Sequence, residues 1–348
     1  MQSSSLSETA PSYSKAHKLE QQILSFYNLE LNKDLTITDI PLNDPQNNFL
    51  HTYHSGKSNG ETLVLLHGYG GSSVLFSSVL KGLSQHFQVY CVDLLGMGLS
   101  SRNSFECKTI EETLVYFISS LEKWREIFNL SEFYLAGHSF GAYIAANYAM
   151  RHPGKVKKLL LVSPVGITVD QDVSAITECV DTMSWPKRKL FRTYIKLWED
   201  KVTPSEFLKK HSIIGNFILS RYVNGQYNHG KNGSKISDLV YKLVSCMMKE
   251  MPCGSEKALH ILLGPPMAIA HMPIENMMLE KIDVPTVFFY GETDWMDWSG
   301  AYRLANNEEK KNFKLKWVKK AGHQIFADNP EQITKDIIEI LHQNDPAV

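Results

Sequence analysis

The sequence Gly137-His138-Ser139-Phe140-Gly141 places a serine between two glycines, after an apolar run at 133–136 and before small residues at 142–146. In a tight turn from strand to helix, the serine backbone is strained, which lifts its hydroxyl above the sheet. The glycines leave room there for the neighbouring strand and helix. A serine that only caps a helix does not need both glycines. The segment therefore predicts Ser139 as a nucleophile.

A serine hydroxyl is a poor nucleophile near neutral pH, so it needs a base, and the base needs an orienting acid. In this strand-turn-helix arrangement, the acid and then the histidine follow the serine along the chain. Asp294 follows an apolar strand by a short turn, and His323 lies in a loop after the next strand. Asp297 is the alternative acid, and Glu292 is less favoured because it precedes the tip of the turn. We expect a triad of Ser139, His323 and Asp294.

Two amide donors are expected for the negative oxygen that forms during attack on a carbonyl. One is the amide of Phe140, directly after the serine. The other belongs to the glycine-rich loop at 67–71, where Tyr69 is favoured and Gly70 is the alternative. His67 and His138 are expected to orient these loops through hydrogen bonds.

The pair Gly96-Met97-Gly98 resembles part of a dinucleotide-binding loop. Ser101 stands where the third glycine of such a loop would be. We therefore interpret this segment as a tight turn.

Nearly continuous apolar strands that alternate with helices predict a mostly parallel sheet, buried on both faces. The expected strands are 35–38, 50–53, 62–66, 87–93, 133–136, 158–162, 285–290 and 313–318. The expected helices are 110–129, 139–151, 299–307 and 331–342, the last capped by Asn329 with Pro330 in its first turn.

The alternation stops between residues 168 and 283, where we expect an all-helical cap inserted before the strand that carries Asp294. The remaining parts are a polar N-terminal extension (1–30) and a core divided into 31–167 and 284–348. The cap contains a segment rich in Gly and Asn at 224–230.

The 348 residues carry a formal net charge of −1, which gives no reason to expect a nucleic acid partner. The cysteines, at 91, 107, 179, 246 and 253, show no Cys-x-x-Cys pair and no zinc-like spacing. We interpret them as reduced thiols of an intracellular protein. Residues 1–20 lack the apolar core of a secretory signal, and no stretch reaches the roughly 18 apolar residues of a membrane span.

Together these residues resemble the α/β-hydrolase superfamily over about residues 50–345. Within it, the chain is similar to the abhydrolase-domain four and five subfamily, which includes plant and yeast lysophosphatidic acid acyltransferases and N-acylphospholipid lipases. The Trp295-Met296-Asp297 continuation is the most specific part of the match. The matching segments are 121–125, 137–141, 161–166 and 290–297.

The resemblance implies lipid chemistry on an acyl-enzyme at Ser139: hydrolysis of acyl-lipid esters or amides, or transfer of an acyl group to lysophosphatidic acid. No metal or bound cofactor is implied, and acyl-CoA would be a substrate. The subfamily is also described by a His-x4-Asp motif, matched by His323 and Asp328. Asp328 is either part of an acyltransferase site or a carboxylate that stabilises the following helix.

Two segments of the cap bear on a lipid substrate. Residues 185–198 mix basic and aromatic side chains, which suits either an anionic membrane surface or an ordinary amphipathic lid helix. Residues 261–270 are apolar and would line an acyl-chain pocket or pack within the lid.

The alternatives to a lipid enzyme are a small-molecule esterase or aminopeptidase with the same triad, and a binding protein that regulates a lipase on lipid droplets. One branch of the subfamily has lost the nucleophile and acts in that way, whereas this chain retains Ser139. The expected location is the cytoplasm, with peripheral contact to lipid droplets or membranes.

Overall fold

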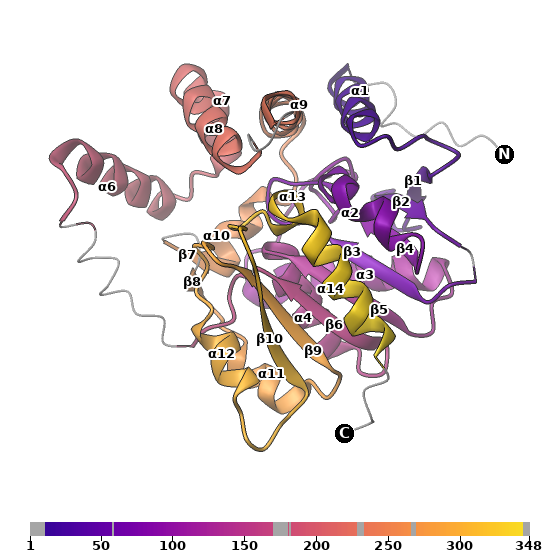
Figure 1. The fold of residues 1–348 in the computed structure, drawn as a ribbon. Helices are drawn as coiled ribbons and strands as arrows, with labels where there is room; N and C mark the ends of the chain where they lie inside the picture. The colour runs from indigo at the N-terminus through magenta and orange to yellow at the C-terminus, as the bar shows by residue number, and fades with distance from the viewer. Residues whose placement is uncertain are drawn as a thin grey trace.

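The computed structural model describes residues 11–57, 59–169, 180, 182–227, 233–265 and 269–343. Its centre is an eight-stranded sheet in the order β1-β2-β4-β3-β5-β6-β9-β10 (Figure 1). β2 pairs antiparallel with both β1 and β4, and the other neighbours are parallel. The strands are β1 (Leu35–Pro41), β2 (Phe49–Ser55), β3 (Thr62–Leu66), β4 (Gln88–Val92), β5 (Phe133–His138), β6 (Val156–Val162), β9 (Thr286–Gly291) and β10 (Phe313–Val318).

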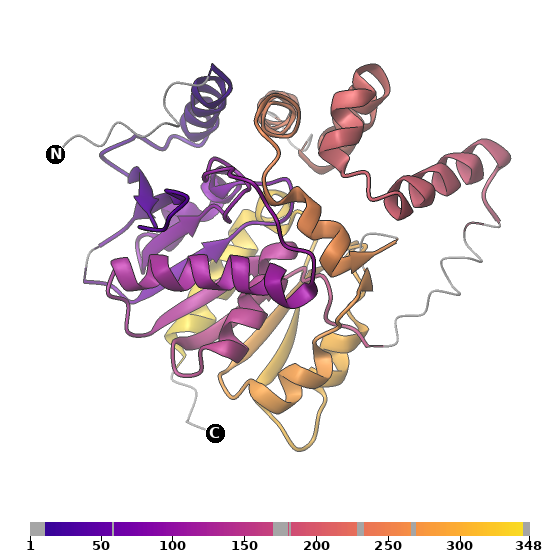
Figure 2. The same cartoon turned by 180° about the vertical axis from the view of Figure 1, so that it is seen from behind.

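Helices cover both faces of the sheet because its central strands are apolar on both sides. In β3, Leu63 and Leu65 join the core on one face, and Val64 and Leu66 join the core on the other. The first face is covered by α2 (Ser77–Leu83) and α14 (Pro330–His342). The second face is covered by α3 (Ile110–Ile127) and α4 (Phe140–Arg151), and Figure 2 turns this face toward the viewer. The expected fold class is confirmed.

The observed ends of the expected elements lie within three residues of the expected ones. The helix α12 (Ser299–Ala305) and α14 lie where they were expected. The Asn329 side chain accepts a hydrogen bond from the Gln332 amide at 3.1 Å, and Pro330 opens α14, so the expected cap of this helix is confirmed.

The helix found before residue 30 is not among the expected elements. There the chain forms α1 (Pro11–Phe26), whose buried residues Tyr13, Ala16, Leu19 and Ile23 recur every three or four positions. This helical spacing was the available signal. Within the expected polar extension, residues 11–26 therefore form a packed helix, whereas residues 1–10 lie outside the described residues.

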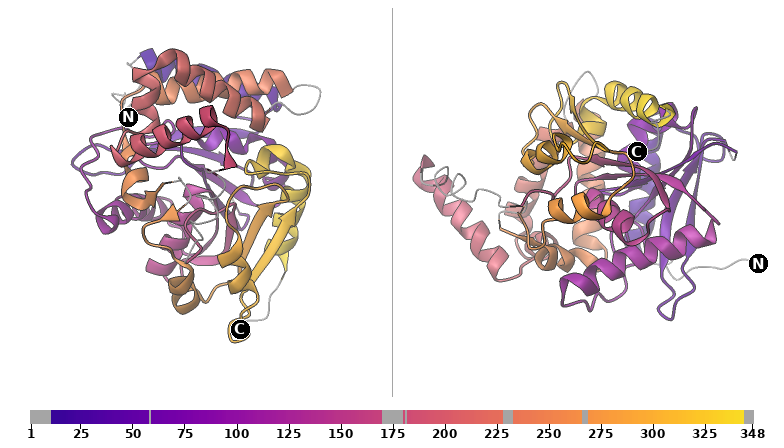
Figure 3. Two further views of the ribbon diagram at one scale, coloured as in Figure 1. Left: turned by 90° about the vertical axis from the view of Figure 1, so that its left-hand side faces the viewer. Right: turned by 90° about the horizontal axis from the view of Figure 1, so that it is seen from below.

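The segment between β6 and β9 is mostly helical in its described part, and the left view of Figure 3 shows these helices above the sheet. It also contains a two-stranded antiparallel sheet, so it is not all helical. Its elements are α6 (Trp185–Glu199), α7 (Pro204–Lys210), α8 (Ser212–Tyr227), α9 (Gly233–Ser245), η2 (Cys246–Glu250), η3 (Ser255–Lys257), α10 (Ala258–Leu262), β7 (Leu263–Gly264), β8 (Ile269–Ala270) and α11 (Glu275–Lys281).

Some sequence-based expectations fall on residues outside the described ranges. These are Cys179, part of the segment rich in Gly and Asn (228–230) and part of the apolar segment (266–268). Within the described ranges, no helix is both long and apolar enough to cross a membrane. The four described cysteines, Cys91, Cys107, Cys246 and Cys253, are free.

Replacing Gly141 by alanine should destabilise the fold. A β-carbon there would lie 2.4 Å from the His67 carbonyl oxygen and 2.5 Å from that of Leu66. Because both contacts are with backbone, we expect the free energy of unfolding to fall by about 3 kcal/mol, at the upper end for overpacking. Chemical denaturation measures this change. The control is Gly225→Ala on α8, where a β-carbon would meet nothing within 4 Å and a small gain in stability is expected; equal stability of the two variants would contradict the argument.

Candidate active site

Ser139 lies at the turn between β5 and α4 with a backbone conformation rare for a residue with a side chain. Its φ is 54° and its ψ is −116°. Its amide donates to the Val162 carbonyl at 2.9 Å, and its carbonyl accepts from the Tyr143 amide at 3.3 Å. The strand and the helix therefore both fix the strained backbone, as the sequence analysis expected.

The three residues of the expected triad lie together. His323 Nε2 is 3.1 Å from Ser139 Oγ, and His323 Nδ1 is 3.3 Å from Asp294 Oδ1. His323 is buried, and its loop follows β10, while Asp294 follows β9. The parallel strands thus bring residues 184 and 29 positions apart in the sequence into one hydrogen-bonded line.

The other donors to Asp294 come from Ser163 and Met296. The Ser163 hydroxyl donates to Oδ2, and the Met296 amide donates to Oδ1 at 3.1 Å. Burial opposes ionisation of Asp294, but the hydrogen bond and charge of His323, together with these donors, hold its pKa below its ordinary value. Ser163 is not among the site residues expected from the sequence, although it follows the end of β6, the neighbour of β9.

The two alternative acids have other partners. Asp297 accepts from the Ser299 amide at 2.9 Å, at the start of α12. Glu292 accepts from the Lys320 amide at 2.8 Å. The structure therefore places Asp294, and neither of these carboxylates, against His323.

Three side chains brace the loop that carries His323. His138 Nε2 donates to the His323 carbonyl at 2.8 Å, and the ring of Trp295 lies with its centre 5.0 Å from that of His323. Burial, assisted by the nearby His323, lowers the pKa of His138 to about 3, so His138 is neutral at physiological pH. Asp328 Oδ2 accepts from the Gly322 amide at 2.8 Å, which gives this carboxylate a role in loop geometry.

The glycine-rich loop after β3 lies against the nucleophile. A β-carbon at Gly68 would approach Ser139 Cβ to 3.0 Å. Among the described residues, the amides of Tyr69 and Phe140 donate no hydrogen bond to another protein group. Both amides are thus available to an oxygen bound beside Ser139, and Gly70 remains the alternative donor to Tyr69.

Hydrogen bonds of His67 and Asp93 hold the glycine-rich loop and the residues that follow it. His67 Nδ1 donates to the Gly68 carbonyl at 2.8 Å, and Nε2 accepts from the Leu94 amide at 3.0 Å. Burial lowers the pKa of His67, in agreement with this neutral tautomer. The Asp93 carboxylate, which the sequence analysis missed, accepts from the amides of Ser73 at 2.5 Å and Leu99 at 2.7 Å.

The turn at Gly96–Gly98 is the tight turn that was expected. Gly96 and Gly98 have φ values of 79° and 53°. A β-carbon at Gly98 would collide with the Asp93 carboxylate at 2.1 Å. This close approach, rather than nucleotide binding, explains the glycine.

A small pocket lies next to the glycine-rich loop and is partly formed by the cap. Met247 and Met248 of η2 contribute its apolar wall, and an Arg102–Glu256 ion pair of 2.5 Å closes another side. The Tyr69 hydroxyl is buried and has no hydrogen-bond partner in the described part of the chain. The pocket is lined by Tyr69, Gly70, Gly71, Met97, Gly98, Arg102, Met247, Met248 and Glu256.

The apolar segment 261–270 was expected either to line an acyl-chain pocket or to pack within the lid, and its described part is packed in the core. Leu262, Leu263 and Ala270 belong to the buried core on the α3 and α4 face of the sheet. The two methionines of η2 are the residues found beside the loop instead.

This arrangement can carry out nucleophilic acyl chemistry. A base within hydrogen-bond distance can take the serine proton, a carboxylate orients the base, and two amides can stabilise an oxyanion. All the protein groups required for acyl transfer through a serine ester are present.

Comparisons with known proteins concern the fold and the relatives of the whole chain. Residues 61–197 match the family model described as alpha/beta hydrolase fold. The chain is 34% identical to the probable 1-acylglycerol-3-phosphate O-acyltransferase of Oryza sativa subsp. japonica, over 79% of this chain and 65% of that protein. It is 28% identical to the human 1-acylglycerol-3-phosphate O-acyltransferase ABHD5, over 81% of this chain and 78% of that protein. The chain thus spans slightly less than two thirds of the length of the rice relative.

Among solved structures, carboxylesterase CesB from Bacillus subtilis superimposes with a TM-score of 0.66 at 19% identity, covering 95% of this chain and 98% of that one. A bacterial membrane phospholipase A superimposes with a TM-score of 0.64 at 16% identity, covering 94% and 90%. At these identities the likeness supports the fold.

Replacing Asp294 by asparagine should lower kcat/KM for a p-nitrophenyl ester by about 10³–10⁴-fold, because the amide stabilises the wrong tautomer of His323 and leaves the imidazolium without a charge partner. The matched control is Asp297→Asn, three residues along, which should remain within a few-fold of the unchanged protein. Stopped-flow release of p-nitrophenol measures both. A larger loss in the Asp297 variant would assign the acid to that residue instead.

Proposed function

We propose that this chain, which has the α/β-hydrolase fold, is a serine enzyme that removes acyl groups from lipids or transfers them to lysophosphatidic acid. The observation that carries the proposal is the hydrogen-bonded line from Ser139 through His323 to Asp294. The proposed oxyanion donors are the amides of Phe140 and Tyr69, with Gly70 as the alternative to Tyr69.

In the proposed reaction, His323 Nε2 takes the proton of Ser139 as Oγ attacks the acyl carbonyl. The carbonyl oxygen becomes an oxyanion held by the two amides, and Asp294 stabilises the imidazolium. His323 then gives the proton to the leaving alcohol or amine, or to the leaving thiol when acyl-CoA is the donor, which leaves an ester on Ser139. In the second half of the reaction, His323 deprotonates the group that attacks the ester on Ser139. Attack by water releases the fatty acid, and attack by a lysophosphatidic acid hydroxyl releases the diacyl product.

The pocket beside the glycine-rich loop has a free volume of about 10 Å³, room for about one water, so an acyl chain would enter it only when Met247 and Met248 move aside. Met247 and Met248 are flexible apolar side chains that adapt to an acyl chain. The unpartnered Tyr69 hydroxyl gives the same pocket a polar group for a glycerol or carbonyl oxygen. The names of the rice and human relatives favour lysophosphatidic acid as the acyl acceptor.

A small-molecule esterase is the second candidate, because the CesB structure shares the fold over nearly its whole length. A lipase-regulating binding protein is the third, and it requires no reactive serine. Asp328 is proposed to position the His323 loop through Gly322, and any acyltransferase role for it would act through that loop.

The decisive experiment compares the unchanged protein with Ser139→Ala on lysophosphatidic acid, with and without acyl-CoA. Mass spectrometry should detect fatty acid or diacyl product from the unchanged protein, and at least 10³-fold less from the variant, because no acyl-enzyme can form. The control is Ser119→Ala, an exposed serine of α3, which should retain full activity.

The products distinguish the candidates. Diacyl product that requires acyl-CoA identifies a transferase, and free fatty acid released from lysophosphatidic acid without acyl-CoA identifies a lipid hydrolase. Turnover of short-chain esters but of neither lipid reaction favours the esterase. No turnover, together with no labelling of Ser139 by a fluorophosphonate, would rule out the serine-enzyme proposal.

We also propose that the cap contacts a lipid surface. On α8, Ile213 is 85% exposed, Phe217 66% and Ile214 57%, and these side chains share one side of the helix. Such a group of exposed apolar residues usually marks an interaction site. The opposite side of α8, with Leu219 and Val223, is buried.

The nearby helix α6 adds positive charge. One face of α6 carries Trp185, Arg188, Lys189, Arg192 and Lys196. Since the whole chain has a net charge of only −1, this face is a local basic surface that suits anionic lipid headgroups. The proposed location is therefore the surface of an anionic membrane or lipid droplet.

The Ile213→Ser, Phe217→Ser double variant should bind vesicles of phosphatidylcholine and phosphatidic acid about tenfold or more weakly, because it removes two insertable apolar side chains. Vesicle sedimentation measures this affinity. The control is Val115→Ser, which alters a 47% exposed apolar residue on α3, outside α6 and α8, and should leave binding unchanged. Equal binding by all three proteins would exclude the α8 surface as the contact.

A further inference from the structure

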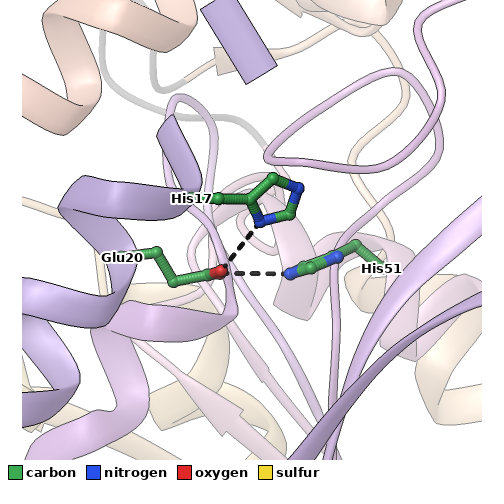
Figure 4. Close-up of side chains that lie close together, drawn as sticks. All are labelled: His17, Glu20 and His51. Carbon is green, nitrogen blue, oxygen red and sulfur yellow. Dashed lines mark hydrogen bonds and ion pairs between the residues drawn. The ribbon is translucent and has the colours of Figure 1, made fainter. Parts of the chain in front are cut away.

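A second group of titratable side chains lies away from the triad, where α1 meets β2. His17 and Glu20 come from successive turns of α1, and His51 comes from β2 (Figure 4). Glu20 Oε2 is 3.2 Å from His17 Nδ1, and Glu20 Oε1 is 3.1 Å from His51 Nε2. The three donor groups converge within 4.8 Å of one another.

These separations suit a small divalent metal ion. In a tetrahedral zinc site with bonds of about 2.0–2.1 Å, neighbouring donor atoms lie about 3.3 Å apart. Imidazole nitrogen and carboxylate oxygen are both ordinary zinc ligands. The spacing of His17 and Glu20, three residues apart, places them on one face of α1.

The surroundings of His51 and Glu20 resemble the outer shell of a metal site. His51 Nδ1 lies 2.6 Å from Asp39 Oδ1, and the Tyr53 hydroxyl donates to Glu20 Oε1 at 2.5 Å. A histidine that binds metal through one nitrogen usually donates its other N–H to a carboxylate, which fixes its tautomer.

The charges of the group also favour a cation. Glu20 and His51 are each only 1% exposed, and Asp39 adds a second carboxylate. One protonated imidazole leaves these side chains with a net charge of −1. Protonation of both would place two positive rings with centres 5.4 Å apart. A divalent ion bound to neutral imidazoles balances both carboxylates without that repulsion.

We propose that His17, Glu20 and His51 bind a zinc ion that joins α1 to β2, with Asp39 orienting His51. The side chain of His17 is 33% exposed, so solvent reaches the group and a water can complete the coordination. The zinc has no part in the chemistry at Ser139, and this site is independent of the proposed function.

The site would fix more than α1 itself. Figures 1 and 2 show α1 beside α9, and Lys15 forms a 2.5 Å ion pair with Glu250 of η2. The same turn, η2, carries Met247 and Met248 of the pocket wall. Zinc would therefore hold the helix that supports the cap side of the pocket.

The test uses the full chain, first freed of metal with a chelator and then dialysed against ZnCl₂. We expect close to one zinc per chain by mass spectrometry, and a melting temperature raised by at least about 3 °C over the metal-free protein. His17→Ala should weaken zinc binding at least tenfold and abolish the rise. His17 is chosen because it is the most exposed ligand, so that the variant is expected to fold.

The control is His211→Ala, which removes an exposed histidine of the cap and should bind zinc as the unchanged protein does. The proposal is overturned if the unchanged protein binds no zinc at micromolar concentrations; the group is then a hydrogen-bonded ion pair only. It is also overturned if His17→Ala retains zinc and the rise in melting temperature, because the metal then lies elsewhere.

Discussion

The candidate site depends on how closely the backbone of the Ser139 turn approaches the end of β3. Gly141 lies against the carbonyls of Leu66 and His67, and Gly137 lies against Gly141 and Ala142, so that none of these contacts leaves room for a side chain. This packing holds Ser139 at a positive φ that an isolated peptide would rarely adopt. The strain is maintained by the sheet and α4 together, and it sets the direction of the hydroxyl and of the next amide.

The candidate site also requires that the buried Asp294 carboxylate stays ionised. Burial of Asp294 opposes its charge, and three hydrogen-bond partners offset that cost. They come from separate parts of the fold: Ser163 after β6, Met296 in the loop after β9 and His323 after β10. The acid is therefore held by the order of three parallel strands, and its loop alone does not determine its position.

Much of this arrangement could be predicted from the sequence because the sheet leaves strong local patterns. The strands were expected close to their observed ends, and the order of serine, acid and histidine follows from parallel topology. Ser163 and Asp93 were missed because a single polar residue at a strand end has no pattern of its own. Its partners are known only when neighbouring strands are placed.

The cap and the N-terminal region were harder to predict for another reason. The apolar residues of α8 suggest a buried helix, and only the packing of Leu219 and Val223 leaves Ile213 and Phe217 exposed. Likewise, His17 and His51 lie on segments that the sequence does not relate. Their meeting depends on α1, which forms within residues expected to be a polar extension.

The placement of α1 has a consequence for how the chain folds. Lys15 and Glu250 are 235 residues apart, and α1 packs against α9 and η2 as well as against the core. During synthesis, α1 leaves the ribosome long before these partners have been made. Its apolar side is therefore exposed to solvent or bound by a chaperone until then. Contacts of such long sequence separation slow folding because their loop-closure entropy is lost before the contacts are gained. The contacts of α1 with α9 and η2 can therefore form only after the cap has been synthesised and folded.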